Sequence, residues 1–123
     1  MENFAALQSL DYYLTTLSYL DEKYVNGSDE DLKYYILEEL DADAHTFLHY
    51  NTVDILLNAD LIPESVEEKT QQLRDLVRQL IDTKKSLDQI RNDPEWKKAR
   101  QMAAEILSDI HSFQDTQKDN QGI

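Results

Sequence analysis

The stretch DPEWKKARQMAAEILSDIHSF, residues 93–113, sets the fold class of this 123-residue chain. Asp93 followed by Pro94 is typical of a helix start, because aspartate caps the first turn and proline fits its first position. Apolar residues then recur every three or four positions, as the buried side of a helix requires. These residues are Trp96, Ala99, Ala103, Ile106, Ile110 and Phe113. The stretch therefore predicts a long amphipathic helix that places Trp96 and the rest of the stripe in a helical core.

The same spacing predicts four further helices earlier in the chain. The expected spans are 3–25, 29–50, 53–58 and 65–90, of which the third is short. The first helix is expected to turn its apolar stripe toward the core. The stripe consists of Phe4, Leu7, Leu10, Leu14, Leu17, Leu20 and Tyr24.

Polar residues at the expected starts predict how these helices are capped. Asn3 is expected to cap the first helix, and Asn51 or Thr52 the third. Ser65 and Glu68 have the spacing of a capping box, in which each side chain bonds the other residue's backbone. The fourth helix is therefore expected to begin at this box.

Lys84 falls on the apolar stripe of the fourth helix, which predicts a kink or a short break around residues 83–86. The chain has two Gly, two Pro and no β-type alternation. We therefore expect an all-α protein, a compact bundle of about five helices. Residues 1–115 are expected to form a single helical domain, and residues 116–123 a polar, disordered tail.

The composition excludes several classes of protein. The chain contains no Cys, which rules out thiolate zinc sites and thiol nucleophiles. Its first residues lack the features of a signal peptide, and no apolar run approaches the ~20 residues that span a membrane. We therefore expect a cytoplasmic protein with no membrane contact. The net charge of −13 disfavours nucleic acid as a partner and favours a basic protein.

Most of the negative charge lies in the first half. Residues 1–62 hold 13 Asp or Glu against two Lys, a net of −11, whereas residues 63–123 hold 12 against 10 Lys or Arg, a net of −2. The basic residues of the second half alternate with acids, which predicts pairing between residues four apart. All seven tyrosines lie in the first half, and interfaces favour Tyr for its rigid apolar ring and polar tip. This composition is typical of a recognition surface.

Two helical faces in the first half are expected to point outward. On the first helix, Tyr12 and Tyr19 fall opposite the apolar stripe. On the second helix, the side opposite Ile36 and Phe47 carries tyrosines, carboxylates and histidines. The residues expected to bind a partner are Tyr12, Tyr19, Asp31, Tyr34, Tyr35, Glu38, Asp41, His45 and His49. The alternative is that these tyrosines are ordinary half-buried helix residues.

Metal and catalytic motifs are incomplete. His45 and His49, four residues apart, could share a metal ion with Asp41. Thr46 stands where a metalloprotease motif requires Glu, and all these ligands come from one helix, so we expect no metal and no cofactor. The sequence contains no Gly-x-Ser-x-Gly elbow, Gly-rich phosphate loop or Cys–His pair. We therefore expect a protein without catalytic activity.

Small size, absence of Cys, strong acidity and helical patterning occur together with the stretch DPEWKKARQMAAEIL, residues 93–107. In these features the chain resembles the small helical immunity proteins of bacterial toxin–immunity pairs, including those of contact-dependent growth inhibition systems. The resemblance implies that the protein neutralises a cognate toxin, often a basic nuclease, by covering its active site or substrate-binding surface. It implies no site residue, because the family has no common functional motif.

The acidic, tyrosine-rich half favours a stoichiometric inhibitor, an immunity protein or antitoxin, of a basic partner such as a nuclease. A DNA mimic would instead bind many unrelated DNA-binding proteins. A helical adaptor would bind an amphipathic helix with little dependence on salt. A metal-binding bundle would use His45 and His49.

Overall fold

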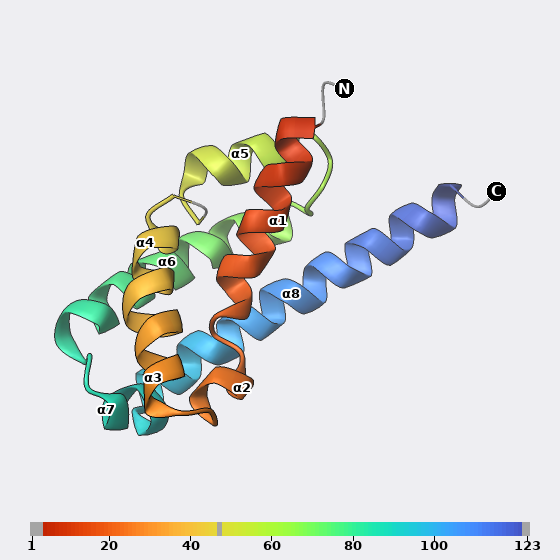
Figure 1. Ribbon diagram of the computed structural model, residues 1–123. Helices are drawn as coiled ribbons and strands as arrows, with labels where there is room; N and C mark the ends of the chain where they lie inside the picture. Colours follow the sequence, from red (N-terminus) through yellow and green to blue (C-terminus); the bar gives the residue numbers. More distant parts are fainter. Residues whose placement is uncertain (1–3, 47, 122–123) are drawn as a thin grey trace.

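The computed structural model describes the backbone of residues 4–46 and 48–121 and the side chains of residues 4–46 and 48–117. In this part of the chain every regular element is a helix, which confirms the expected all-α bundle (Figure 1). The elements are α1 Phe4–Ser18, α2 Glu22–Val25, α3 Asp29–Leu32, the π-helix η1 Lys33–Leu40, α4 Asp41–Ala44, α5 Tyr50–Asn58, α6 Ser65–Thr83, α7 Leu87–Asn92 and α8 Pro94–Gln121. The expected cap Asn3 and core residue Phe47 lie outside the described residues.

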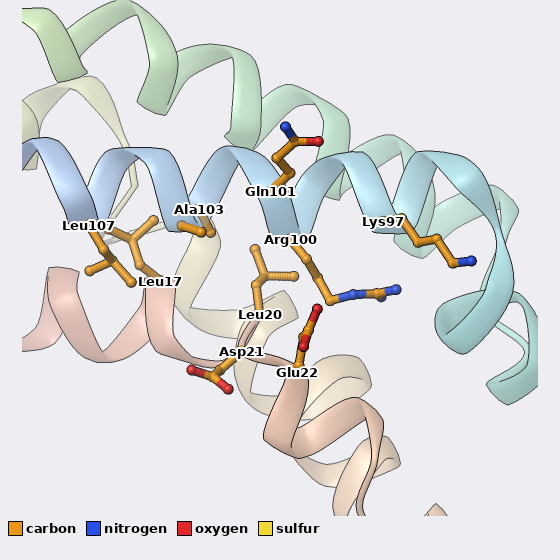
Figure 2. Close-up of a pocket in the computed structure, with 10 residues that line it drawn as sticks. Leu17, Leu20, Asp21, Glu22, Lys97, Arg100, Gln101, Ala103 and Leu107 are labelled. Carbon is orange, nitrogen blue, oxygen red and sulfur yellow. The ribbon is translucent and has the colours of Figure 1, made fainter.

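The helices pack around a shared interior. Helix α6 lies against α8 over a long contact, and α7 and α1 also contact α8. The segments α3, η1 and α4 follow one another without interruption, and α4 packs against α6, while α5 lies against α1 (Figure 1). On the α1 side of α8, Leu17 and Leu20 point toward Ala103 and Leu107 (Figure 2). The α3–η1–α4 segment, through α6, and α1 therefore both pack onto the same pair of helices, α6 and α8.

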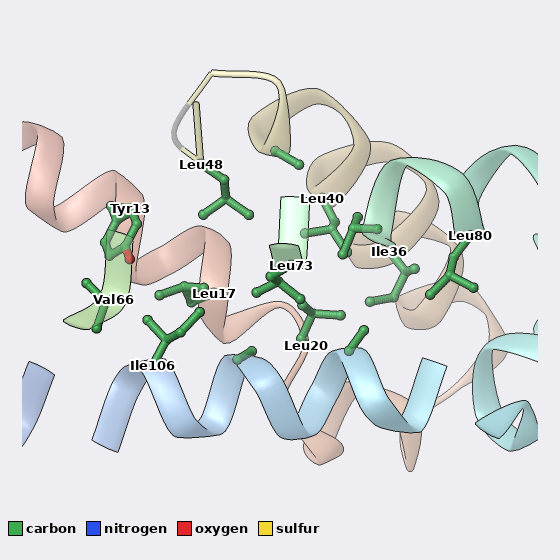
Figure 3. Packing of buried hydrophobic residues seen from close by; sticks show 14 of the residues in the cluster. Tyr13, Leu17, Leu20, Ile36, Leu40, Leu48, Val66, Leu73, Leu80 and Ile106 are labelled. Carbon is green, nitrogen blue, oxygen red and sulfur yellow. The ribbon is translucent and has the colours of Figure 1, made fainter. Parts of the chain in front are cut away.

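The core contains the apolar stripe predicted for residues 93–113. Trp96, Ala99, Ala103, Ile106 and Ile110 are buried, and Phe113 is half-buried. Ile106 points from α8 toward Leu17 of α1 (Figure 3) and belongs to one buried cluster with residues of η1 and α6. The indole nitrogen of Trp96 donates to the backbone oxygen of Lys84 at 2.8 Å, so the polar atom of this buried ring is satisfied. The predicted buried stripe of α8 is therefore confirmed, and the helix continues to Gln121, beyond residue 115, where the helical domain was expected to end.

Helix α1 is rotated relative to the predicted stripe. Phe4 and Leu7 are 71 % and 52 % exposed, whereas Tyr13 and Thr16 are buried. The buried side is turned by roughly 60° from the expected one, at 100° per residue. A hydrogen bond of 2.7 Å between the hydroxyls of Tyr13 and Thr70 satisfies both polar groups and makes this orientation stable.

The first predicted helix is also interrupted. Helix α1 ends at Ser18 and α2 begins at Glu22, so the expectation of one helix to residue 25 is wrong. The carboxylate of Asp21 accepts a hydrogen bond from the backbone nitrogen of Lys23 at 2.9 Å. Such a side-chain bond competes with helix continuation and starts a new helix.

The second predicted helix ends at Ala44 rather than near residue 50. His49 then caps α5, because its ring nitrogen Nδ1 accepts from the backbone nitrogen of Asn51 at 3.1 Å. The third helix therefore begins at Tyr50, and neither Asn51 nor Thr52 is its cap. His49 consequently does not continue the helical face of His45.

A capping box forms at the start of α7 and not at the start of α6. Glu64 is the N-cap of α6 and makes no side-chain cap, because the chain is already helical there and Ser65 lies inside the helix. Ser86 and Gln89 form the box at α7. The predicted break is confirmed, since α6 ends at Thr83.

Ion pairs of the second half connect elements instead of following one helix. Lys69 and Asp109 join α6 to α8 at 2.7 Å. Lys84 pairs with Asp93 at 2.9 Å. Among the described side chains, only His45 has an ion-pair partner four residues away, which is Asp41. The predicted pairing of the basic residues of the second half with acids four residues away is therefore wrong. The bundle uses these charges to fasten helices together.

Candidate functional site

The π-helix η1 determines which side chains of the second helical segment point outward. Buried residues occur at every fourth position of this segment: Leu32, Ile36, Leu40, Ala44 and Leu48. On a regular α-helix such a spacing turns the stripe by about 40° at each step, away from the core. The longer i→i+5 bonds of a π-helix widen the turn and offset this rotation. One side therefore stays buried, and the opposite side stays outward.

Four tyrosine rings lie together beside η1, and we call Tyr19, Tyr24, Tyr34 and Tyr35 the tyrosine cluster. Tyr19 follows α1, Tyr24 belongs to α2, and the other two belong to η1. Tyr35 is central, with ring centroids 4.3 Å from Tyr24, 5.0 Å from Tyr34 and 5.8 Å from Tyr19. Tyr34 meets Tyr35 edge to face and is 48 % exposed. The break after α1 is what brings Tyr24 against η1.

Two partly buried carboxylates, Glu39 and Asp43, adjoin the tyrosine cluster. Burial and then the negative charges of Asp43 and Glu39 raise the pKa of Tyr19 to about 12. A hydrogen bond with Glu39, and the charge of Glu39, raise the pKa of the Tyr34 hydroxyl. Burial and the charge of Glu39 also raise the pKa of Asp43.

Neither of these carboxylates has a cation within ion-pair distance among the described side chains. The two lie four residues apart, where like charges repel. The tyrosine cluster therefore borders an uncompensated negative charge, in a half of the chain that carries a net of −11 (13 Asp or Glu against two Lys). A positively charged group brought to this place would be stabilised.

One positive charge of the protein does lie on the tyrosine cluster. The ammonium nitrogen of Lys23 is 5.0 Å from the ring centroid of Tyr24. A cation above an aromatic face is attracted by the negative face of the ring. Within residues 4–46 and 48–117, the Lys23 ammonium has no carboxylate at ion-pair distance.

Three of the tyrosines predicted to bind a partner lie in the tyrosine cluster: Tyr19, Tyr34 and Tyr35. Tyr34 is exposed, whereas Tyr19 and Tyr35 are partly buried. Tyr12 is 44 % exposed on α1 and is not one of the four rings. Of the tyrosines expected to point outward, Tyr12 and Tyr34 are exposed, whereas Tyr19 and Tyr35 are half-buried, as the alternative expected. The rings gather between the end of α1 and η1 instead of following α1.

The acids and histidines predicted to bind a partner do not lie on one continuous helical face. Asp31 and Glu38 are exposed on α3 and η1. Asp41 and His45 lie 3.6 Å apart, each about half exposed. His49 lies in the turn before α5, with its ring 4.1 Å from that of Tyr50. We take the tyrosine cluster, its adjoining carboxylates Glu39 and Asp43, and the three acids Asp31, Glu38 and Asp41 together as the candidate binding face.

Sequence reasoning missed Tyr24, Glu39 and Asp43 as parts of this face. Tyr24 was assigned to the apolar stripe because the break after Ser18 was not expected. The strict four-residue spacing of buried residues from Leu32 onward is the signal that could have revealed η1 and hence the place of Glu39.

In residues 4–46 and 48–117, no group of three or more His, Asp or Glu side chains is arranged to hold a metal ion. The shared metal ion considered for His45 and His49 required both to lie on one helix. The chain leaves the helix after Ala44, so that requirement is not met.

A groove of about 640 Å³ lies between the end of α1 and α8, with Leu17, Leu20 and Leu107 among its lining residues (Figure 2). Its most buried cation, Arg100, donates to the backbone oxygens of Ile90 and Arg91 at 2.7 and 3.2 Å. These bonds satisfy the last carbonyls of α7. The arginine of this groove therefore has a structural role.

No helix among residues 4–46 and 48–121 is both long and apolar enough to cross a membrane. Comparisons with protein-family models, with curated proteins and with solved structures found no match.

Proposed function

We propose that this protein binds a basic protein through the candidate binding face and neutralises it stoichiometrically, without catalysis, as an immunity protein or antitoxin does. The observation that carries this proposal is the tyrosine cluster beside Glu39 and Asp43, two carboxylates with no cation at ion-pair distance among the side chains that the structure describes. Aromatic anchors and desolvated charges are the features that dominate binding energy at protein interfaces. The partner fitting best is a toxin nuclease in the cytoplasm, because a surface that binds nucleic acid carries Lys and Arg to contact phosphates.

The charge distribution supports a fast and specific association. The excess of negative charge in residues 1–62 attracts a basic surface over a distance of about 10 Å at ordinary salt. Rings that become buried at contact slow dissociation, so the two features act on different steps of binding. An inhibitor that covers a nuclease needs both, because it must reach the nuclease before the nucleic acid does.

The experiment is capture of the partner from native cells with the tagged protein, at about 50 mM and about 300 mM salt, followed by titration of the purified pair. The test variant carries Asp31→Lys, Glu38→Lys and Asp41→Lys. The matched control carries three equivalent changes at exposed acids of α6, Glu67→Lys, Asp75→Lys and Asp82→Lys. Both variants change the net charge equally, so a difference between them reports the position of the charge.

We expect one basic partner whose activity is lost at a 1:1 ratio, and whose affinity falls about tenfold more for the test variant than for the control. Unchanged affinity of the test variant would overturn the proposal. Capture of many basic proteins, each released by duplex DNA, would identify a DNA mimic instead. Binding that does not depend on salt would identify a helical adaptor.

A further inference from the structure

The position of Lys23 is unusual for a lysine in so acidic a segment. It is one of two lysines in residues 1–62, against 13 Asp or Glu, and its side chain is exposed. An exposed lysine in an acidic segment commonly pairs with a carboxylate, yet the ammonium nitrogen of Lys23 lies 5.0 Å from the ring centroid of Tyr24. The ring and its surroundings therefore offer a cation a favourable place.

The surroundings explain this preference. The ring of Tyr24 lies 4.3 Å from that of Tyr35, in a tilted arrangement, and 6.4 Å from that of Tyr19, edge to face. The ring that Lys23 contacts is therefore part of an aromatic group whose partners hold it in place. The charges of Asp43 and Glu39 act on the hydroxyl of Tyr19, and that of Glu39 acts on the hydroxyl of Tyr34, so carboxylate charge borders the tyrosine cluster. Ring faces and carboxylates thus act on a cation in the same direction.

We infer that the tyrosine cluster is a receptor for the guanidinium group of one arginine side chain of the partner, and that Lys23 holds this place in the free protein. This inference rests on the proposed function, since it names the group by which the basic partner is recognised. Arginine fits better than lysine because its guanidinium is planar, stacks on aromatic rings and loses less hydration. It can also bond a carboxylate with two parallel hydrogen bonds.

Lys23 then acts as an internal competitor. Binding of the arginine requires that the Lys23 ammonium leave the ring of Tyr24, which lowers the affinity by the strength of that contact. Lys33, the other lysine of this half, is exposed at the start of η1 and makes no ring contact of this kind in the described part of the chain. The two lysines therefore form a matched pair for a test.

The test measures binding of a hexaarginine peptide by calorimetry at about 50 mM salt. We expect Lys23→Gln to tighten binding about threefold more than Lys33→Gln, although both remove one positive charge. Equal effects of the two changes would show that only net charge matters and would overturn the inference. A hexalysine peptide is expected to bind more weakly than hexaarginine, and equal affinities would overturn the preference for a guanidinium.

A second pair of variants tests the ring directly. Tyr24→Phe keeps the aromatic face and is expected to bind hexaarginine within about twofold of the natural chain, whereas Tyr24→Leu is expected to bind about three- to fivefold more weakly. Equal affinity of the two variants would overturn the inference. If circular dichroism shows that Tyr24→Leu does not fold, the comparison of Lys23→Gln with Lys33→Gln still tests the inference.

The outcomes separate this inference from the proposed function. In one outcome, charge reversal at Asp31, Glu38 and Asp41 lowers the affinity for the captured partner, while the lysine and Tyr24 variants do not change the affinity for hexaarginine specifically. The proposed function then stands and the arginine receptor is wrong. In the other outcome, the lysine and Tyr24 variants change the affinity for hexaarginine as expected, but charge reversal leaves the affinity for the captured partner unchanged. The arginine receptor then stands and the proposed function is wrong.

Discussion

The hydroxyl oxygens of Tyr13 and Thr70 lie 2.7 Å apart in the core, with both side chains fully buried. This bond connects α1 to α6 and fixes the rotation of α1. Removing one hydroxyl leaves the other buried without a partner, which costs about 1–3 kcal/mol. We expect Tyr13→Phe and Thr70→Val each to destabilise the protein by this amount, measured by urea unfolding.

The double variant Tyr13→Phe/Thr70→Val is expected to lose less stability than the sum of the two single losses, because no buried hydroxyl is then left alone. Additive losses would show that the bond does not couple the two helices.

Alkaline pH is expected to destabilise the protein over a window set by two tyrosines. Burial raises the pKa of Tyr13 to about 12, the bond to Thr70 partly opposing it, and burial with nearby carboxylate charge raises that of Tyr19 to about 12. The folded state thus favours the neutral hydroxyls. Their contribution to stability is fully present below the unfolded pKa of 10.0 and is lost as pH rises through about 12.

Thermal melts between about pH 9 and about pH 11.5 test this window. Stability should fall with pH, and the fall should be shallower in Tyr13→Phe, which has one tyrosine fewer to ionise. An equally steep fall in that variant would contradict the assignment to Tyr13.

Arg91 is expected to hold the segment that carries Tyr24. Its guanidinium donates to the backbone oxygens of Val25 and Gly27 at 3.1 and 3.2 Å and to Asp29 at 2.7 Å. Lysine cannot make three such bonds in a fixed plane. Arg91→Lys should therefore cost about 1–3 kcal/mol and speed amide hydrogen exchange around residues 25–29.

Arg78 is exposed on α6 and provides the matched control. Arg78→Lys should change stability by less than about 0.5 kcal/mol and leave exchange near Val25 unaltered. Equal effects of the two changes would contradict the specific role of Arg91.

Asp43→Asn is expected to stabilise the protein at neutral pH. Burial and the charge of Glu39 raise the pKa of Asp43 above 3.8, so the folded state favours the protonated carboxyl. The stability that this group contributes is therefore present below pH 3.8 and is lost as pH rises through the raised pKa. Asparagine carries no charge and keeps an oxygen that can accept from Tyr19. The gain should be about 0.2–0.5 kcal/mol, the size of a like-charge pair four residues apart.

The gain should disappear below the unfolded pKa of 3.8, where Asp43 is protonated in both states. Chemical unfolding at about pH 7 and about pH 3 measures both values. Asp54→Asn, at an exposed position of α5, is the control and should have little effect at either pH.

The parts of the fold that could be predicted are those decided by neighbouring residues. Asp93 and Pro94 start α8, and Lys84 marks the end of α6, because a cap, a proline or a charge on an apolar stripe acts locally. The rotation of α1 could not be predicted, since it depends on a bond between Tyr13 and Thr70, which are distant in sequence.

The candidate site shows the same division. Helical spacing places Tyr34 on the outward side of the second helix and Tyr35 toward its edge, and Tyr34 is exposed while Tyr35 is half-buried. Tyr24 could not be predicted as part of the site, because its approach to Tyr35 requires the chain to break after Ser18 and turn back. The pairing of Glu39 with Tyr34, five residues apart, requires the π-helical turn and has no counterpart in α-helical spacing.

The π-helix η1 makes chain length, and not only residue identity, a determinant of this surface. A regular α-helix that gained one residue between Leu32 and Leu40 would rotate everything after it by about 100°, whereas the wider turns of η1 take up extra length and keep the buried stripe on the core. The number of residues in this segment therefore determines the surface as much as the residue types do.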